Sequence, residues 1–357
     1  QLALAPHDFF LWEQLLHLAE SADGGLDPAT APPENVRHVS EAFDAFLAKY
    51  PLCYGYWRKY AELAAITRGA AGAEEVLARS VQAMPNAIEL WMAYCAHVIK
   101  HDARNEDRIR SLFEQGASAV GLDFMSHPFW DLYVEWETAG ARMDCVFELL
   151  KRIIRIPLYQ YARYFERQAR KLADPATLAA IEAAVRDRPA DAVNVEASKA
   201  ADTRPMTIEE QIKAGIRQGV DQLALDIHQK TQEATHQRWA FESGIKRPYF
   251  HVTALDTDEL DNWHRYLDFE EENGDADRIA ALFERCLVAC ALYEDFWMRY
   301  ARWTLANKDA DTACRVYERA EQCFIPLGQP SLWLAHAVLE EEQGKVALAR
   351  SIYDKLL

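Results

Sequence analysis

The fold is decided by the stretch from Trp263 to Leu287, which reads WHRYLDFEEENGDADRIAALFERCL. It begins with a Trp-x-x-Tyr motif and an acidic run, breaks at Asn273-Gly274, and ends in an apolar stripe around Phe283. Apolar residues at positions i, i+3, i+4 and i+7 of that stripe are typical of an amphipathic helix. Asn and Gly both accept the left-handed backbone that often ends a helix. The stretch therefore predicts a helix, a short turn and a second helix.

The same pattern recurs along the chain. Six tryptophans form two groups, with spacings of 34 and 39 residues in the first group and 34 and 36 in the second. Such spacings are within the range of helix-pair repeats. Five of these tryptophans have Tyr three residues later, whereas the last has His336, and a second apolar landmark follows each Trp after 17 to 22 residues. The landmarks that we assign to the repeat core are Trp57, Tyr60, Trp91, Tyr94, Trp130, Tyr133, Trp263, Tyr266, Phe283, Trp297, Tyr300, Tyr317, Trp333 and Tyr353.

The repeats predict an all-α fold. Strand patterns are nearly absent, and a single helix pair can bury its apolar face only by stacking on neighbouring pairs. We therefore expect an α-solenoid of antiparallel helix pairs, in two arrays joined by a long helix. Trp and Tyr side chains three residues apart ordinarily pack between the two helices of a pair. We favour that role over an exposed ladder for peptide binding.

The domain organisation follows from where the period fails. A capping box from Thr207 to Glu210 opens a helical pattern without proline that continues to about Ser243. A helix of that length would span on the order of 50 Å at 1.5 Å per residue. The preceding residues are rich in Ala, Asp and Pro, a composition typical of a mobile connection. The predicted parts are an N-terminal array in residues 1–172, a flexible linker in 173–205, a long connecting helix in 206–245 and a C-terminal array in 246–357.

Composition narrows the class of protein. The 357 residues include 39 basic and 56 acidic side chains, so the formal net charge is −17. This charge opposes general binding to the phosphate backbone of nucleic acids. No apolar run reaches the roughly 20 residues that a membrane-spanning helix needs, and we expect no membrane contact. Seven cysteines without a Cys-x-x-Cys pair predict reduced thiols, which are typical of the cytosol or nucleus.

Motifs of common catalytic sites are absent. The sequence has no Gly-rich phosphate loop, Gly-x-Ser-x-Gly elbow or His-Glu-x-x-His helix. Glu137, Glu270 and Glu340 each lie seven residues after a motif Trp. Because each belongs to its own repeat, whereas paired catalytic carboxylates must converge, we expect a repeated structural role such as pairing with an Arg of the second helix. The sequence predicts no catalytic residue, no cofactor and no enzyme activity.

Two pairs of residues have the helical spacing of metal ligands. Cys286 and Cys290 are one helical turn apart, and so are His97 and His101. A structural zinc site needs four ligands, and neither pair has a third or fourth ligand nearby in the sequence. We therefore predict buried thiols and partly exposed histidines rather than a metal site.

One basic stretch interrupts the acidic chain. From Lys151 it reads KRIIRIPLYQYARYFERQARKL, with a single acidic residue before Lys171. Interleaved tyrosines and cations could bind RNA or an acidic peptide. The alternative is a solvated helix face whose arginine stems cover the core. The cations of this candidate patch are Lys151, Arg152, Arg155, Arg163, Arg167, Arg170 and Lys171.

A second stretch, RPYFHV, precedes the C-terminal array. Pro248 favours an extended backbone at Arg247 and stops a helix from continuing. Arg247, Tyr249, Phe250 and His251 then either fill the groove of the C-terminal array or contact a partner chain. We favour the internal contact, because exposed rings would form an adhesive patch.

The repeat resembles the half-a-tetratricopeptide (HAT) family of RNA-processing scaffolds. The resemblance is carried by Trp-x-x-Tyr, the acidic residue seven after the Trp, and a second helix with a triplet such as Phe-Glu-Arg. Ala64, Val98 and Thr304 stand where that acidic residue is expected. From Lys246 to Trp303 the chain is similar to a splicing branch of the family that belongs to the U1 small nuclear ribonucleoprotein. Before residue 170 the similarity is at the level of the repeat alone.

The resemblance implies a nuclear, non-enzymatic scaffold of pre-mRNA splicing that acts in recognition of the 5′ splice site. It implies U1 proteins as partners and a dimer with itself or a related HAT protein through the C-terminal array. RNA contact would be indirect or through the basic stretch. The chain ends at Leu357 within a second-helix pattern, whose apolar face would favour a partner. The alternatives are a HAT scaffold of mRNA 3′-end cleavage and an enzyme subunit built on a helical solenoid.

Overall fold

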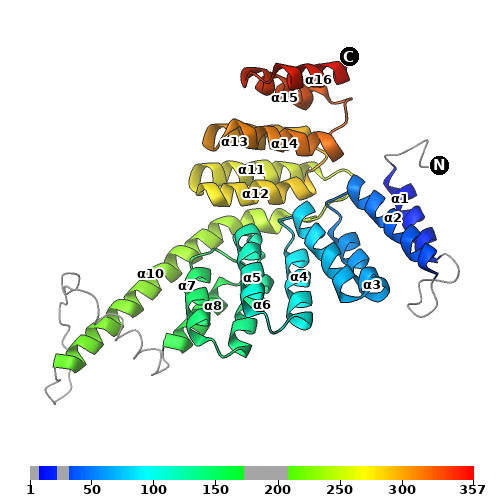
Figure 1. Ribbon diagram of the computed structural model, residues 1–357. Helices are drawn as coiled ribbons and strands as arrows, with labels where there is room; N and C mark the ends of the chain where they lie inside the picture. The colour runs from blue at the N-terminus through cyan, green and yellow to red at the C-terminus, as the bar shows by residue number, and fades with distance from the viewer. Residues whose placement is uncertain (1–7, 22–31, 173–207) are drawn as a thin grey trace. The chain divides into compact units, whose positions relative to one another are not determined.

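The structure is a computed structural model that describes residues 8–21, 32–172 and 208–357, within which the chain forms helices and no strand (Figure 1). In chain order the helices are α1 Phe9–Ser21, α2 Pro33–Lys49, α3 Tyr54–Ala83, α4 Ile88–His101, α5 Glu106–Val120, α6 His127–Ala139, α7 Met143–Ile153, α8 Tyr161–Leu172, α10 Ile208–Gly244, α11 Thr257–Asn273, α12 Ala276–Ala289, α13 Glu294–Asn307, α14 Ala310–Cys323, α15 Pro330–Glu342 and α16 Val346–Leu356. Helices that follow one another pack together from α1 to α5, from α6 to α8 and from α11 to α16, so the predicted all-α solenoid is confirmed. None of these helices is both long and apolar enough to cross a membrane.

The helices divide into two compact units. One unit contains Gln1–Asp123 and Phe241–Leu357, and the other contains Phe124–Ala240. The long helix α10 lies where the sequence predicts one, and its last turn belongs to the first unit. The predicted flexible linker, 173–205, lies outside the described residues. The division into four parts stays a prediction.

Local sequence explains where several helices begin and break. The helix α3 is a helix pair that breaks at Gly69, whose φ of 73° would strain any residue with a side chain. Three second helices, α5, α12 and α14, begin with an Asx cap whose side chain accepts a hydrogen bond from a backbone N–H. These caps are Asn105 to Arg108 N at 3.3 Å, Asp275 to Arg278 N at 3.0 Å and Asp309 to Thr312 N at 2.7 Å.

Gly274 is required for a different reason from the one that its sequence suggests. The expected left-handed backbone is wrong, because its φ is −88° and its ψ is 163°. A Cβ atom at this position would instead lie 2.5 Å from Oε2 of Glu270. The glycine therefore makes room for a buried carboxylate at the turn between α11 and α12.

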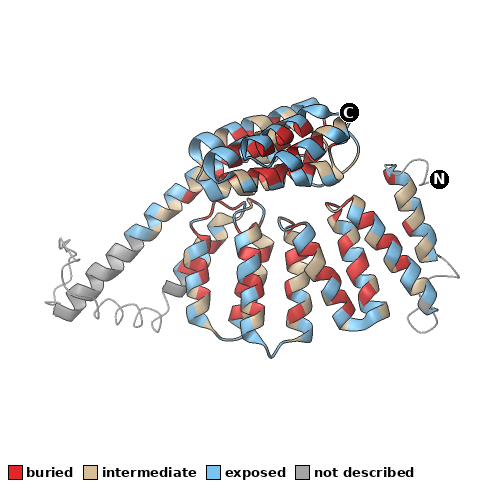
Figure 2. Cartoon of the chain, turned by 45° about the horizontal axis from the view of Figure 1, so that its top comes forward, coloured by how far each residue is buried: buried red, intermediate tan, exposed pale blue. Residues whose placement is uncertain are grey.

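Aromatic stacking joins four of the repeats to the helix before them. Buried residues gather on the faces where neighbouring helices meet, and the outer faces are exposed (Figure 2). The third residue after the motif Trp lies nearly parallel to a ring of the preceding helix, which adds about 0.5–1.5 kcal/mol beyond burial of its area. The stacked pairs are Tyr60 on Phe43 at 5.0 Å, Tyr266 on Phe241 at 5.0 Å, Tyr300 on Phe283 at 4.8 Å and His336 on Tyr317 at 5.4 Å.

An ion pair accompanies three of these stacks. The residue after the stacked Phe is acidic, and it binds an Arg from the second helix of the following repeat. The pairs are Asp44 with Arg79 at 2.7 Å, Glu242 with Arg285 at 2.6 Å and Glu284 with Arg319 at 2.8 Å. In the triplet Phe-Glu-Arg, the Phe ring and the Glu carboxylate thus contact the next repeat. The Arg of the same triplet binds an acidic residue of the previous repeat.

The motif Trp is held within its own repeat. A cation of the second helix, 22 residues later, lies over the indole ring at 5.1 to 5.8 Å, as Arg79, Arg152, Arg319 and Lys355 do over Trp57, Trp130, Trp297 and Trp333. The indole N–H donates to a carbonyl before its helix in four repeats: Trp57 to Pro51 at 2.9 Å, Trp91 to Pro85 at 2.6 Å, Trp297 to Ala291 at 2.8 Å and Trp333 to Ile325 at 3.3 Å. The buried Nε1 of Trp263 has no such partner among the described residues.

One member of the ion-pair series is buried more deeply than the others. The Arg285 side chain is 13% exposed, against 44% for Arg319. Its guanidinium binds both oxygens of Glu242 and lies 3.5 Å from Asp123, so it joins α10 and α12 to the residue that ends the N-terminal part of this unit. Burial alone would lower the pKa of Arg285, but the charges of Asp123 and Glu242 outweigh burial and raise it. This cation therefore stays charged.

Arg285→Met and Arg319→Met test how far burial determines the contribution of each ion pair to the free energy of unfolding. We expect Arg285→Met to lower the free energy of unfolding by about 3–5 kcal/mol, because it leaves two largely buried carboxylates, whose side chains are 7% and 14% exposed, without their cation. The matched Arg319→Met should cost at most about 1 kcal/mol, since that pair is exposed to solvent. Urea unfolding of both variants measures the difference. Equal costs would show that the Arg285 cluster adds nothing beyond an ordinary surface pair.

The indole hydrogen bond can be tested with a second matched pair. Trp297→Phe should cost about 1 kcal/mol more than Trp263→Phe, because it also leaves the buried carbonyl of Ala291 unpaired. The same unfolding measurement applies. If the two substitutions are equally destabilising, the hydrogen bond does not contribute to the repeat.

Candidate functional site

The residues assigned to the repeat core do not form an exposed ladder. Tyr94 and Tyr353 are partly exposed, and the other twelve are buried. Their contacts differ in one respect from the expected packing between the two helices of a pair. The motif Trp faces the second helix of its own pair, whereas the motif Tyr stacks on the helix before it. These side chains thus build the array, and a site for partners must use other residues.

The repeated carboxylates Glu137, Glu270 and Glu340 are all buried. Glu137 binds Arg142, which is the N-cap of α7, and Glu340 lies 3.4 Å from Lys345, the N-cap of α16. Only Glu270 has its partner inside a second helix, where Arg278 of α12 is 3.7 Å away. Each carboxylate therefore anchors the turn of its own pair to the next helix.

The cysteine and histidine pairs remain two-residue contacts. Cys286 and Cys290 are buried, and the rings of His97 and His101 lie 4.6 Å apart. Among the described residues, three buried groups that could hold a metal gather elsewhere, at Cys314, His336 and Glu340. Burial, with a smaller contribution from Glu340, raises the pKa of the Cys314 thiol to about 12. Sequence spacing missed this group because Cys314 lies on α14 and the other two lie on α15.

Arginines of the basic stretch are engaged by an acidic residue of the same unit. Arg163 and Arg167 both bind Asp131 of α6, the second through Nη1 and Oδ1 at 3.1 Å. Tyr164 is buried and donates to the carbonyl of His127 at 2.8 Å. This part of the candidate patch therefore packs α8 on α6.

The remaining cations of the stretch are also held. Lys151 binds Glu148 at 2.8 Å, Arg152 lies over the Trp130 ring, and Arg155 donates to the carbonyl of Lys151. The side chains of Arg170 and Lys171 lie outside the described residues. The described cations fit a solvated helix face that covers the core better than a free surface for phosphates.

Part of the RPYFHV stretch packs inside the first unit, and part of it is exposed to solvent. Phe250 is buried, with its ring 6.3 Å from Tyr50 of the N-terminal helices and 6.0 Å from Phe324 near the end of α14. The His251 ring is 5.9 Å from Phe9. Tyr249 is exposed.

Arg247 stays within this segment. It donates to the hydroxyl and the carbonyl of Thr253, both at 2.8 Å, and its backbone N–H donates to Glu259 at 2.9 Å. Phe250 thus connects the early and late helices of the first unit, while Tyr249 remains available to a partner.

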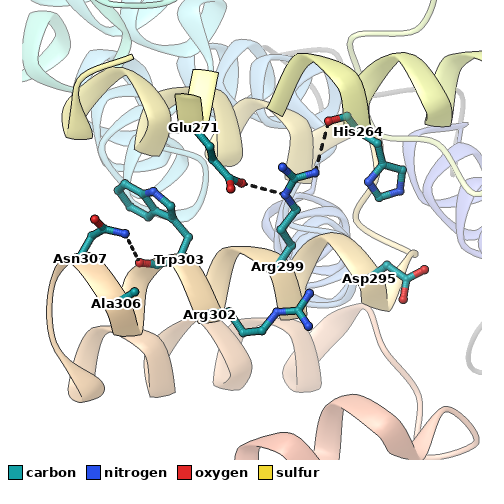
Figure 3. A pocket seen from close by; sticks show the side chains of 8 residues that line it. All are labelled: His264, Glu271, Asp295, Arg299, Arg302, Trp303, Ala306 and Asn307. Carbon is teal, nitrogen blue, oxygen red and sulfur yellow. Dashed lines mark hydrogen bonds and ion pairs between the residues drawn. The ribbon is translucent and has the colours of Figure 1, made fainter. Parts of the chain in front are cut away.

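The candidate docking site is a pocket between the first helices of two successive pairs, α11 and α13 (Figure 3). It has a volume of about 650 Å³ and is lined by His264, Glu271, Asp295, Arg299, Arg302, Trp303, Ala306 and Asn307. Arg299 crosses it and binds Asp268 at 2.6 Å and Glu271 at 2.8 Å. These contacts fix one cationic wall of the pocket.

The other walls of this pocket offer apolar and charged groups together. Trp303 is buried at its base, and the His264 ring stacks on Phe296 at 4.3 Å. Arg302 and Asp295 are exposed and form no ion pair with a residue that the structure describes. The arrangement suits an extended peptide that carries both an apolar side chain and a charged one.

A smaller pocket of about 300 Å³ lies among α3, α4 and α5. Tyr94 and Trp91 line it, which accounts for the partial exposure of Tyr94. Arg108 at its edge is held by Glu74 and by Asp102 at 2.9 Å. With its cation already paired, this pocket offers less to a charged partner than the one between α11 and α13.

Comparison with known proteins extends the resemblance beyond the C-terminal stretch. A family model described as the PRP39 N-terminal HAT repeat matches residues 1–170, and one described as the PRP39 C-terminal HAT repeat matches residues 236–357. The expectation of a repeat-level likeness before residue 170 was therefore too weak. The C-terminal match begins within α10, whose Phe241 and Glu242 make the stack and ion pair of a second helix.

Two relatives and one solved structure place the chain more closely. Pre-mRNA-processing factor 39 of Schizosaccharomyces pombe is 42% identical over 369 residues, which cover 100% of this chain and 59% of the relative. The U1 small nuclear ribonucleoprotein component PRP42 of Saccharomyces cerevisiae is 22% identical, covering 82% of this chain and 54% of the relative. The crystal structure of CSTF-77 has a TM-score of 0.51 at 13% identity, covering 85% of this chain and 65% of that one, and shares the fold. The chain thus spans little more than half the length of these two relatives, and it belongs to the PRP39 family of HAT-repeat proteins.

Proposed function

We propose that this chain is a non-enzymatic protein-protein scaffold of pre-mRNA splicing in the nucleus. The observation that carries the proposal is the match of both HAT regions to the PRP39 models, together with a relative named as a pre-mRNA-processing factor. The name of the second relative supports association with U1 small nuclear ribonucleoprotein proteins, and hence a role at the 5′ splice site. The likeness to CSTF-77 concerns the fold, so it supports no separate function.

The scaffold would act by fixing the positions of bound proteins. The motif residues of each repeat are used in packing, which leaves the pocket between α11 and α13 as the surface for a partner segment. RNA contact would be indirect, because the net charge is −17 and the described cations of the basic stretch already have partners. The role is therefore geometric rather than chemical.

A dimer through the C-terminal array is the second part of the proposal. Leu334 and Val338 lie one turn apart on α15 and are 44% and 47% exposed, and Val346 and Leu348 of α16 are exposed as well. Exposed apolar side chains on two adjacent helices favour burial against another protein. We propose a second copy of this chain as that partner.

Substitution of this apolar face tests the dimer. The chain should have about twice its 40.8 kDa mass in light scattering at micromolar concentration, and Leu334→Asp with Val338→Asp should reduce it to a monomer. Leu305→Asp on α13 is the control, because Leu305 is similarly exposed and lies on another repeat. A mass of one chain at every concentration would contradict the dimer, and an unchanged dimer in the double variant would place it elsewhere.

The docking pocket is tested by charge reversal at Arg302. Tagged chain purified from nuclear extract should recover U1 RNA, and Arg302→Glu should lower that recovery at least about tenfold if the Arg anchors a partner. Arg265→Glu is the matched control, since Arg265 is an exposed arginine of α11 outside the pocket. Equal recovery with both variants would remove the pocket from the proposal, and absence of U1 RNA from the unaltered chain would contradict the U1 association.

A further inference from the structure

Two residues at the contact between α14 and α15 have side chains that are chemically related. His336 takes the place of the Tyr in the Trp-x-x-Tyr motif. Cys314 lies three residues before the landmark Tyr317, at the position that Ala280 occupies in the preceding repeat. A thiol and an imidazole are both good metal ligands. They lie beside Glu340, the carboxylate seven residues after the motif Trp of the last described repeat.

The three side chains converge in the interior. Cys314 comes from α14, His336 and Glu340 come from α15, and all three are buried. One potential ligand atom of each lies within 4.8 Å of the other two. The sulfur, nitrogen and oxygen ligands in a tetrahedral zinc site are roughly 3.5 Å apart, so small side-chain rotations would bring these atoms to coordination distance.

The orientation of His336 is the second, independent observation. Its Nδ1 lies 2.6 Å from Oε1 of Glu321, and its ring stacks on Tyr317. The opposite nitrogen, Nε2, points toward Glu340 at 3.4 Å and makes no hydrogen bond with a described residue, although the side chain is only 2% exposed. A histidine held through one nitrogen by a carboxylate, with the other nitrogen directed at further ligands, is the usual arrangement of a metal-binding histidine.

We infer that Cys314, His336 and Glu340 bind a divalent transition metal, with zinc as the expected ion. A thiolate, an imidazole and a carboxylate form a donor set that suits zinc, and a water would complete four ligands. Glu321 is the outer carboxylate that orients His336. The bound ion would join α14 to α15, and so would connect two successive helix pairs.

Lys345 is the group that a metal must displace. Its Nζ lies 3.4 Å from Oε2 of Glu340, and 2.8 Å from Oδ1 of Asp311. The Lys345 side chain is 43% exposed, so it can turn away from Glu340 and keep its contact with Asp311. Without a metal, Lys345 is the cation beside the buried carboxylate of Glu340, so the test is a competition between the metal ion and Lys345.

Cobalt titration of the full 357-residue chain tests the site. After treatment with a chelator and its removal, Co²⁺ should bind with one equivalent and produce thiolate-to-cobalt charge-transfer absorption. Zn²⁺ should then displace Co²⁺, because it binds such sites more tightly. The midpoint of thermal unfolding should rise with either ion, since a ligand that binds the native state stabilises it.

Variants assign the signal to these residues. Cys314→Ser should abolish the charge-transfer absorption, and His336→Tyr, which restores the repeat motif, should lower cobalt affinity at least 100-fold. Glu321→Gln should weaken binding about 10- to 100-fold without removing the absorption. Cys323→Ser is the matched control, because Cys323 lies on the same helix outside the group.

The inference does not depend on the function proposed above, and two results would overturn it. The first is the absence of stoichiometric cobalt binding by the unaltered chain. The second is binding that persists in His336→Tyr, or a thiolate signal that Cys323→Ser removes and Cys314→Ser does not. Far-ultraviolet circular dichroism establishes that each variant is folded, and Glu340→Gln replaces any variant that is not.

Discussion

The array depends on one contact, in which a ring of the first helix lies flat on a ring of the helix before it in four of the repeats. A helix pair in a solenoid has no core of its own and is stable only against its neighbours. The stack of Tyr300 on Phe283 brings Glu284 within reach of Arg319, and Arg319 in turn covers Trp297. Ring, acid, arginine and indole thus form one connected set across two repeats, and misplacing the stack would disturb all four.

This constraint decides which surfaces remain for partners. The motif Trp, Tyr and Arg face inward or along the seam between helices, so their chemistry is not available to a bound protein. The pocket between α11 and α13 is built from the positions between the motif residues, such as His264 and Arg302, which differ from one repeat to another. Conserving the packing set while varying the residues between lets one fold present different partner sites along its length.

The sequence revealed the period because tryptophan is rare and its spacing is regular, and the period was enough to predict an all-helical solenoid. It could not show that the motif Tyr packs on the preceding helix, since periodicity gives the face of a helix but not its neighbour. Contacts between distant segments were equally hidden. Asp123 meets Arg285, and Tyr50 meets Phe250, through the fold of the first unit rather than through any local pattern. Nor could the sequence show that Asp131 of an earlier helix holds two arginines of the basic stretch.

The contact between α14 and α15 shows how such an array can acquire chemistry without losing its packing. His336 replaces a tyrosine, yet its ring still stacks on Tyr317 at an angle of 20°, as Tyr300 does on Phe283 at 21°. The imidazole therefore keeps the aromatic stack and adds two nitrogens. One nitrogen is held by Glu321, and the other is directed at Glu340. Cys314 takes the position that Ala280 has on α12 and adds a sulfur there. The packing of α14 on α15 brings the three side chains together, and no new loop or domain is required.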